Sequence, residues 1–337
     1  MKTKRALRFF VGLLIVTLIM LGACSRASGS SSTTASRPSY PTKPIQLISP
    51  SAAGGDLDYD NRLFAQFMTK ELGVNMVVSN VSGAGSVTGM KQVLDSAPDG
   101  YTVVGSNSEG FFPKLIGATD IGVESFKMVG IYATDSMTVV LARGDLPGVK
   151  DLPTFVQYAR ANPGSLEYGM ATGSSNHMTG FALNTNLGID TRFVDVGNNA
   201  QKLTALLGKQ IDYCILTYQL GKEYIDSGEF IFLALLDNKR PAYIPDAPLL
   251  SDFGYKDVEY VKPMWIGMPS ETPDDVVETF AAAMKRVVEN PDFRAECARV
   301  GVDPVFYGPK EAYDVIDKIR ASSFAPFAED MIRILGR

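Results

Sequence analysis

The segment Pro44–Gly73, PIQLISPSAAGGDLDYDNRLFAQFMTKELG, contains the unit on which this 337-residue chain is built. It opens with a short apolar run from Ile45 to Ile48, which is typical of a core strand. A turn of small residues follows at 49–55, and apolar residues then recur at helical spacing until Gly73. A strand, a glycine turn and a helix start direct backbone N–H groups to one place. The segment therefore predicts an α/β unit, whose turn is either an anion site or an ordinary connection.

Residues 1–23 have the pattern of a secretion signal. Four basic side chains precede an apolar run, Phe9 to Met20, which is too short to be a good membrane span. The run ends in Leu21-Gly22-Ala23-Cys24, which resembles the lipobox of bacterial lipoproteins, and this resemblance implies that Cys24 is lipidated and becomes the mature N-terminus. Residues 24–42 are rich in Ser and Thr and bury too little apolar surface to fold, so they are predicted to form a flexible tether.

Charge and cysteine count argue against several classes of protein. The chain has a net charge of −5, which becomes about −9 without the four basic residues of the signal, so no nucleic-acid partner is expected. Cys214 and Cys297 lie in apolar surroundings typical of buried small side chains, although their pairing stays open. His177 is the one histidine and there is no HExxH or CxxC motif, so neither a metal site nor a cofactor is expected.

Two more strand-and-turn units follow the first. A short strand at 76–79 leads into the turn Asn80–Ser86, whose glycine spacing does not match a dinucleotide-binding fingerprint. The strand at 102–105 ends in the polar turn Ser106-Asn107-Ser108. Open α/β sheets bind ligands beyond the carboxyl ends of such strands, so these turns are candidate ligand loops.

Short motifs along the chain, taken in order, resemble those of the tripartite tricarboxylate transporter receptors, also called Bordetella-uptake-gene-type solute-binding proteins. The matching residues are Pro50, Gly54, Gly55, Asp58 and Arg62; Asn80 with Gly83-Ala84-Gly85; Ala97–Thr102; Asn162-Pro163-Gly164; Tyr168-Gly169 with Gly173–His177; Leu206–Asp212; and Pro245–Pro248. The resemblance covers essentially residues 40–337. It implies a type II periplasmic-binding-protein fold, with two α/β lobes around a central ligand cleft. Lobe 1 would comprise residues 43–138 and 259–337, and lobe 2 residues 139–258.

The rest of the pattern is compatible with this architecture. A crossing strand is expected at 137–141 and a return crossing at 260–268. Between them the spacing predicts helices at 152–161, 178–186 and 201–207 and strands at 165–170, 191–196, 211–216 and 230–235. An amphipathic helix is predicted at 273–289, opened by Thr272 and Pro273, and helices near 293–300 and 310–322 close the chain.

Proteins that this chain resembles hold a ligand carboxylate with backbone N–H groups and small hydroxyls from two facing loops, because the backbone must approach the ligand closely. The resemblance implies these ligand-binding residues: Ser51, Ala52, Ala53, Gly54, Gly55 and Asp58 in lobe 1, and Ala171, Thr172, Gly173, Ser174, Ser175, Asn176 and His177 in lobe 2. The strand-end turn adds Ser106 and Asn107 in lobe 1, and positions that depart from the family pattern add Asn198, Asn199 and Thr217 in lobe 2. Helix capping by Asp58, Ser175 or Asn176, with no ligand role, is the alternative.

Several positions depart from the family pattern. Asp56 and Asp60 replace small or apolar residues, and like charges at one loop disfavour a purely anionic ligand. Val196-Gly197-Asn198-Asn199 stands where the family commonly has a Tyr-Lys/Arg-Gly turn, and Leu216 stands where an aspartate is common. Losing the cation and gaining amides favours a neutral, amide-bearing or zwitterionic ligand. His177 lacks an acid partner in the sequence, so no catalytic residue is expected.

These observations predict a solute-binding lipoprotein outside the cytoplasm, lipid-anchored to the cell membrane. It would be a monomer that captures a small organic acid or related metabolite by lobe closure and delivers it to a membrane permease. A component that presents its ligand to a membrane signalling protein is the alternative, and genome neighbours would distinguish the two. An enzyme is not expected, because no nucleophile–base pair is evident.

Overall fold

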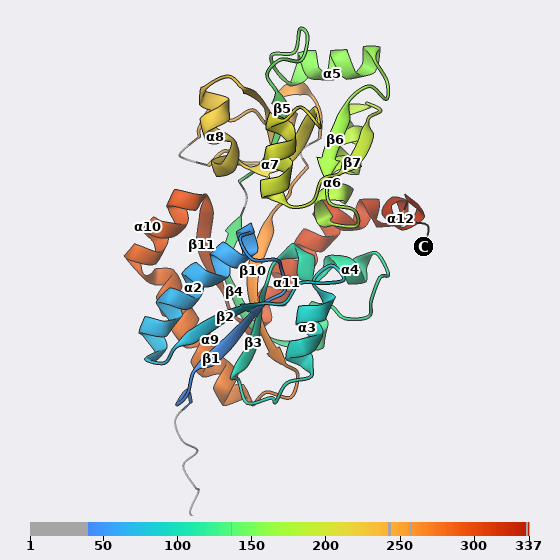
Figure 1. Ribbon diagram of the computed structural model, residues 1–337. Coiled ribbons are helices and arrows are strands. Elements are labelled where there is room, and N and C mark those ends of the chain that lie inside the picture. The colour runs from blue at the N-terminus through green and yellow to red at the C-terminus, as the bar shows by residue number, and fades with distance from the viewer. Residues whose placement is uncertain (1–39, 136, 242–243, 257, 335, 337) are drawn as a thin grey trace, which may run out of the picture. The chain divides into compact units, whose positions relative to one another are not determined.

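The computed structural model describes residues 40–135, 137–241, 244–256, 258–334 and 336. The predicted signal at 1–23, the predicted lipidation site Cys24 and most of the predicted tether lie outside the described residues. Tyr40–Arg337 forms one compact unit. Two separate β-sheets, each with its own helices, build this unit, and the predicted α/β fold class of two lobes is confirmed (Figure 1).

The first sheet has six strands in the order β11-β4-β10-β3-β1-β2. β1, β2 and β3 are parallel to one another, whereas β10 and β11 pair antiparallel to β4. Its strands are β1 (Ile45–Ser49), β2 (Met76–Asn80), β3 (Thr102–Ser106), β4 (Phe126–Asp135), β10 (Lys262–Pro269) and β11 (Val302–Tyr307). The helices around it are α2 (Asp56–Leu72), α3 (Val87–Leu94), α4 (Phe112–Leu115), α9 (Asp274–Glu289), α10 (Pro291–Val300) and α11 (Pro309–Ile319).

The second sheet has five strands in the order β7-β6-β8-β5-β9. β6 is parallel to β7 and β8, and β5 pairs antiparallel to both β8 and β9. Its strands are β5 (Thr138–Arg143), β6 (Glu167–Met170), β7 (Arg192–Asp195), β8 (Tyr213–Thr217) and β9 (Phe230–Leu235). The helices around it are α5 (Leu152–Ala161), α6 (Ser175–Leu187), α7 (Asn199–Leu207) and α8 (Tyr218–Asp226).

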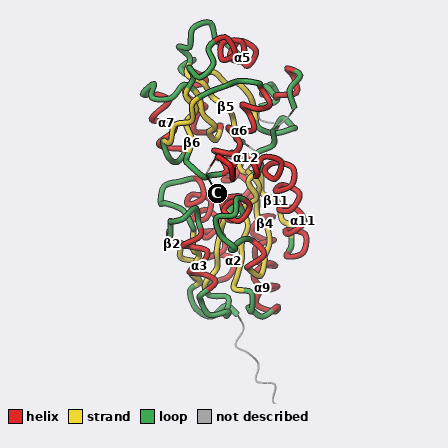
Figure 2. Tube along the Cα trace, turned by 90° about the vertical axis from the view of Figure 1, so that its right-hand side faces the viewer, coloured by secondary structure: helices red, strands yellow, loops and turns green. Residues whose placement is uncertain are grey.

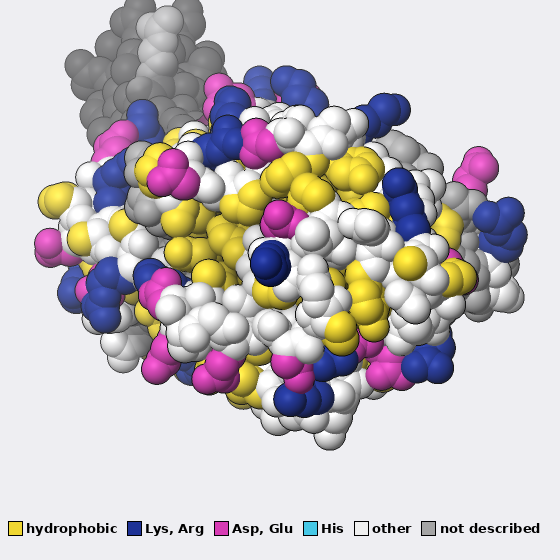
Figure 3. All heavy atoms as spheres, turned by 90° about the horizontal axis from the view of Figure 1, so that it is seen from above, with side chains coloured by type: hydrophobic (Ala, Val, Ile, Leu, Met, Phe, Trp, Pro, Cys, Tyr) yellow, Lys and Arg dark blue, Asp and Glu magenta, His cyan; other side chains and the backbone are white. Residues whose placement is uncertain are grey.

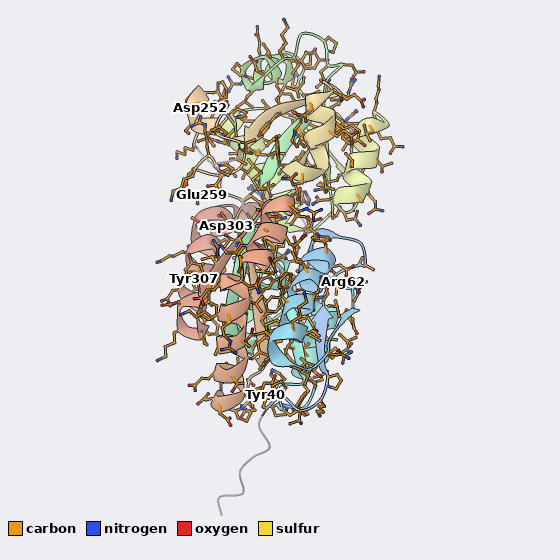
Figure 4. All side chains as sticks on the ribbon, turned by 90° about the vertical axis from the view of Figure 1, so that its left-hand side faces the viewer. Tyr40, Arg62, Asp252, Glu259, Asp303 and Tyr307 are labelled. Atoms are coloured by element: carbon orange, nitrogen blue, oxygen red, sulfur yellow. The ribbon has the colours of Figure 1, made fainter. Side chains whose placement is uncertain are left out.

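Two segments carry the chain between the sheets. β4 of the first sheet ends at Asp135 and β5 of the second begins at Thr138, while β9 returns through residues 236–261 into β10. Glu259 of the return segment lies where the two lobes meet, and it accepts a hydrogen bond from Asn238 Nδ2 at 2.7 Å (Figure 4).

The C-terminal segment forms a further connection between the two sheets' helices. After α11, a π-helical turn (Arg320–Phe324) leads into α12 (Ala325–Ile334), which contacts α6 (Figure 2). The Phe324 ring meets Tyr260 of the return segment with centroids 5.9 Å apart. Helix α12, although it follows the first lobe in sequence, therefore packs against the second.

Helices cover both faces of each sheet because each sheet buries two apolar faces. On one face of the first sheet α2, α9 and α10 share a core around Phe64, Phe280 and Phe293, and α3, α4 and α11 cover the other face. Helix α2 illustrates the local signals: Asp56 and Asp58 lie in its first turn, and Gly73 ends it with φ of 70°.

The predicted elements differ from the observed ones mainly where two strands and three helices were not anticipated. The sequence pattern did not predict β4 or β11, nor the helices α4, α8 and α12. Helix α5 and strand β9 have the predicted bounds. Cys214 and Cys297 are both buried and free, which closes the question of their pairing.

Candidate ligand-binding site

A cavity of about 280 Å³ lies at the facing ends of the two sheets, and we call it the lysine cavity after Lys202 and Lys262. Both sheets contribute to it through strand ends and helix starts. Its lining residues are Ser51, Ala52, Gly55, Asp56, Leu57, Ser86, Asn107, Glu109, Ala171, Ser174, Asn176, Gly197, Asn198, Asn199, Lys202, Tyr260 and Lys262.

The turn between β1 and α2 is built by Asp58. Its carboxylate accepts from the backbone N–H of Gly54 at 2.9 Å and from Asn80 Nδ2 at 2.9 Å, and it pairs with Arg62 Nε at 2.9 Å. Burial opposes ionisation, but these donors together hold the pKa of Asp58 below its usual range. Arg62 extends from α2 on the first lobe (Figure 4). Asp58 therefore shapes the turn and does not line the cavity.

Asp56 connects the first sheet's helix to the second sheet. One of its carboxylate oxygens accepts from Asn199 Nδ2 at 2.6 Å and from Thr217 Oγ1 at 3.4 Å, and Lys262 Nζ lies 3.4 Å from the same oxygen. Burial would raise the pKa of Asp56, but Lys262 and Lys202 outweigh it and hold that pKa below its usual range. Asp56 is thus a charged residue that links the start of α2 to the start of α7.

Lys262 is the first residue of β10, and its ammonium group is buried among carboxylates. It pairs with Asp135 at 2.5 Å as well as with Asp56. Burial alone would lower the pKa of Lys262, but Asp135 and Asp56 raise it well above its usual range. This lysine is therefore charged and already neutralised by the protein.

Lys202 on α7 is a buried lysine in a different situation. Its side chain is 2% exposed, and its ammonium group donates to the carbonyl of Ile215 at 2.7 Å. Among the residues that the structure describes, no carboxylate lies within 4.0 Å of its Nζ. Burial lowers the pKa of Lys202 to about 8. An ammonium group has three donors, so Lys202 can still bind an anion in the cavity.

Glu109 follows β3 in a short 3-10 turn (Ser108–Gly110), and its carboxylate is held by the start of α6. Ser175 donates to it from the hydroxyl, and the backbone of Ser175 also bonds to it. The Ser175 hydroxyl in turn lies 2.6 Å from the Tyr260 hydroxyl. Burial raises the pKa of Glu109 in spite of these bonds. A carboxylate of the first lobe thus occupies the α6 N-terminus, a place where anions are favoured.

The loop before α6 is organised by its own side chains. Ser174 caps the helix by accepting from the His177 N–H, and His177 Nδ1 accepts from the Gly173 N–H at 3.3 Å. The His177 ring packs on Phe193 with centroids 5.3 Å apart, and burial lowers the pKa of His177. His177 therefore supports the loop and does not line the lysine cavity.

The structure brings together about half of the residues predicted for the site. Those that line the lysine cavity are Ser51, Ala52, Gly55, Asn107, Ala171, Ser174, Asn176, Asn198 and Asn199. Ser175 and Thr217 touch lining carboxylates, and Gly54 lines a neighbouring cavity. Ala53, Asp58, Ser106, Thr172, Gly173 and His177 do not line the lysine cavity.

The charged residues were missing from the predicted binding set. Asp56, Glu109, Lys202 and Lys262 all line the cavity. One signal for Lys202 was present in the sequence, because it shares a helix face with the buried Ala205 and Leu206 at i+3 and i+4. The turn at 196–199 lacks the Lys or Arg that is common in the family, but Lys202, three residues further on, places a cation at the cavity.

Two further observations bear on what the chain can bind. Within the described ranges, no cluster of His, Cys, Asp or Glu side chains is suited to holding a metal ion, and no helix there is long and apolar enough to span a bilayer. On the face shown in Figure 3, acidic and basic side chains alternate, so this face lacks the broad basic patch of a nucleic-acid-binding protein.

Comparison with known proteins identifies relatives over most of the chain. Residues 61–321 match the family model described as "Tripartite tricarboxylate transporter family receptor". A UPF0065 protein of Bordetella pertussis is 30% identical over 295 residues, covering 86% of this chain and 88% of that protein. The solved structure of periplasmic binding protein BugD is similar at 25% identity with a TM-score of 0.71, covering 88% of this chain and 99% of that one. "R. palustris Rpa4515 with adipate" shares the fold at 22% identity with a TM-score of 0.76, covering 86% of this chain and 98% of that one.

Proposed function

This chain belongs to the tripartite tricarboxylate transporter receptor family, and from that membership we propose that it captures a small carboxylate-bearing solute in the lysine cavity and delivers it to a tripartite tricarboxylate-type permease. It is a solute-binding receptor rather than an enzyme. The adipate in a structural relative supports a carboxylate as the ligand class.

The proposal rests mainly on the buried ammonium group of Lys202. It is a buried cation without a carboxylate partner among the described residues, and it lines a cavity beside Asn198 and Asn199. Burying an ammonium group is costly unless it is paired, so a solute carboxylate that reaches Lys202 would relieve that cost. The cavity of about 280 Å³ lies just below the ~300–1,000 Å³ range of small-molecule sites, which favours a small solute.

The lobes that enclose the cavity are proposed to comprise residues 43–138 with 259–337, and 139–258. Support comes from the two sheets, because the chain changes sheet after Asp135 and returns to the first sheet at Lys262. Closure about these two connections would bring Lys202 and the β1–α2 turn onto opposite sides of one solute.

Ligand binding tests the proposal directly. Calorimetry and thermal shift on the purified protein, with a panel of small mono- and dicarboxylates and amino acids, should find a solute that raises the melting temperature. Lys202→Met should weaken that solute about ten-fold or more, because a hydrogen bond to a charged group contributes roughly 1.5–3 kcal/mol. The exposed Lys91→Met on α3 is the control and should bind normally. A panel without any binder, or equal affinity in Lys202→Met, would contradict the proposal.

We also propose that Cys24 anchors the receptor to the membrane through a lipid, on the strength of the Leu21–Cys24 sequence. Cys24→Ser should then move the protein from the membrane fraction to the soluble fraction of cells that express it. Incorporation of a labelled fatty acid should disappear in the same variant. Unchanged fractionation and labelling would remove the lipid anchor from the proposed function while leaving solute binding intact.

A further inference from the structure

A second cavity of about 280 Å³ adjoins the lysine cavity and shares Gly55 and Asp56 with it. Three carboxylates, Asp56, Asp60 and Asp135, line this acidic cavity, and no lysine or arginine is among its lining residues. Its remaining walls are largely apolar and come from both lobes, with Tyr59, Leu220, Val300 and Val302 among them. The two cavities therefore differ in charge while meeting at the same aspartate, because lysines offset the carboxylates only in the lysine cavity.

Asp60 is the carboxyl group in the acidic cavity that has no partner. The residue is 7% exposed, and the described part of the chain offers its carboxyl group neither a hydrogen bond nor an ion pair. Asp135 is held by Lys262 and by the Met137 N–H at 2.9 Å, and Asp56 is held by Asn199 and Lys262. Burial and then Asp135 raise the pKa of Asp60 well above its usual range, and the opposing charge of Lys262 does not outweigh them.

The places where the second lobe would accept an anion are largely taken by the first lobe. Glu109 occupies the start of α6, and Asp56 occupies the side-chain amide at the start of α7. Lys262 is neutralised by Asp135 and Asp56. One buried cation, Lys202, and one buried acid, Asp60, are thus left over, in adjoining cavities.

Resting on the proposed function, we infer that the solute is a zwitterion, with a carboxylate paired to Lys202 in the lysine cavity and an ammonium group beside Asp60 in the acidic cavity. An organic ammonium suits this place better than a metal ion, because the walls are apolar and the described residues contain no metal-binding cluster. The Tyr59 ring on the wall adds a surface that attracts alkylammonium groups. Asp60, acting on the solute directly, would determine specificity.

Matched pairs of solutes test this inference. Each ω-amino acid differs from a diacid only by the exchange of one carboxylate for an ammonium group: β-alanine and succinate, γ-aminobutyrate and glutarate, δ-aminovalerate and adipate. Calorimetry on the purified wild-type protein should show at least one amino acid binding about ten-fold tighter than its diacid, the size expected for one charged contact. Asp60→Asn should lower the affinity for that amino acid about ten-fold and leave any diacid binding unchanged. Asp95→Asn, an exposed aspartate on the surface, should change neither.

The possible outcomes separate this inference from the function on which it rests. Tighter binding of the diacids would contradict the inference of a zwitterionic solute, but it would agree with the proposed function of binding a carboxylate. If no member of any pair binds, the zwitterion inference fails, and if the wider panel of carboxylates and amino acids also contains no binder, the proposed function fails with it. If Asp60→Asn binds the amino acid with the same affinity as the wild type, the ammonium group does not bind beside Asp60 in the acidic cavity. Because the wild-type comparison involves no substitution, a poorly folded variant could not decide the result.

Discussion

Lys202 links the chemistry of one side chain to the behaviour of the receptor. Its pKa of about 8 in the folded protein is lower than that of a lysine in an unfolded chain, about 10.4, because burial penalises the charge. Between these values the unfolded chain binds more protons than the folded one. The contribution of Lys202 therefore makes the free energy of unfolding rise with pH in that window, and below it the burial penalty is present in full.

Solute affinity should respond to pH in the opposite direction. A carboxylate pairs with the charged form of Lys202, so above pH 8 binding must first restore a proton. We expect the dissociation constant of the carboxylate solute to rise towards ten-fold per pH unit above about 8 and to be flat below that pH. Calorimetry between about pH 6.5 and 9.5 measures this, and Lys202→Met should remove the dependence. Constant affinity through pH 9.5 would show that Lys202 is not the group that meets the carboxylate.

Single residues also mark the limit of prediction from sequence. A structural role for Asp58 could be predicted because an acid shortly after a glycine pair is a local signal. The structure gives Asp58 a bond from the Gly54 N–H, although Gly55 rather than Asp58 is the N-cap of α2. Glu109 gave no such signal, because its partner Ser175 is 66 residues away. When the partner of a charged side chain is distant in the sequence, the pair can be identified only once the fold is known.

Helices and strands whose ends are marked by capping or turn residues were the most predictable. Helix α7 begins at a capping box in which Asn198 accepts from the Gln201 N–H and the Gln201 side chain accepts from the Asn198 N–H, so its start is encoded within four residues. Asn198 thereby has a structural role in addition to lining the cavity, which the family departure at this turn did not reveal.

Strands β4 and β11 were not predicted, and β10 was expected only as a return crossing at 260–268. All eight residues of β10 are buried, so the strand lacks the alternation that identifies a half-exposed strand. Its partners come from residues 126–135 and, on the other side, from β3, both more than a hundred residues earlier in the chain. The antiparallel half of the first sheet therefore depends on long-range pairing, whereas the parallel half follows the repeated strand–turn–helix units.

At the scale of the whole receptor, two carboxylates of the first lobe tie it to the second. Glu109 bonds to Ser175, and Asp56 bonds to Asn199 and Thr217. These bonds use only atoms of the chain, so they favour closure independently of any solute.

Removing both charges should loosen closure. The double variant Asp56→Asn, Glu109→Gln should show a larger radius of gyration than the wild type in small-angle scattering without solute, because two interlobe acceptors of strong hydrogen bonds are weakened. Asp95→Asn, which removes one charge at an exposed site, should scatter like the wild type. Identical scattering curves for the double variant and the wild type would mean that the lobes are held together by other contacts.

The packing of α12 on α6 has a mechanical consequence. Two rigid bodies joined by two connecting segments can both bend and twist about the joint. The C-terminal segment is a third connection, because it runs through the π-helical turn at Arg320–Phe324 to α12 on the other lobe. It restricts part of this bending and twisting. The C-terminal connection opposes those lobe motions that would stretch it, although the two crossings alone would permit them. The proposed lobe closure would thereby be restricted towards a single degree of freedom.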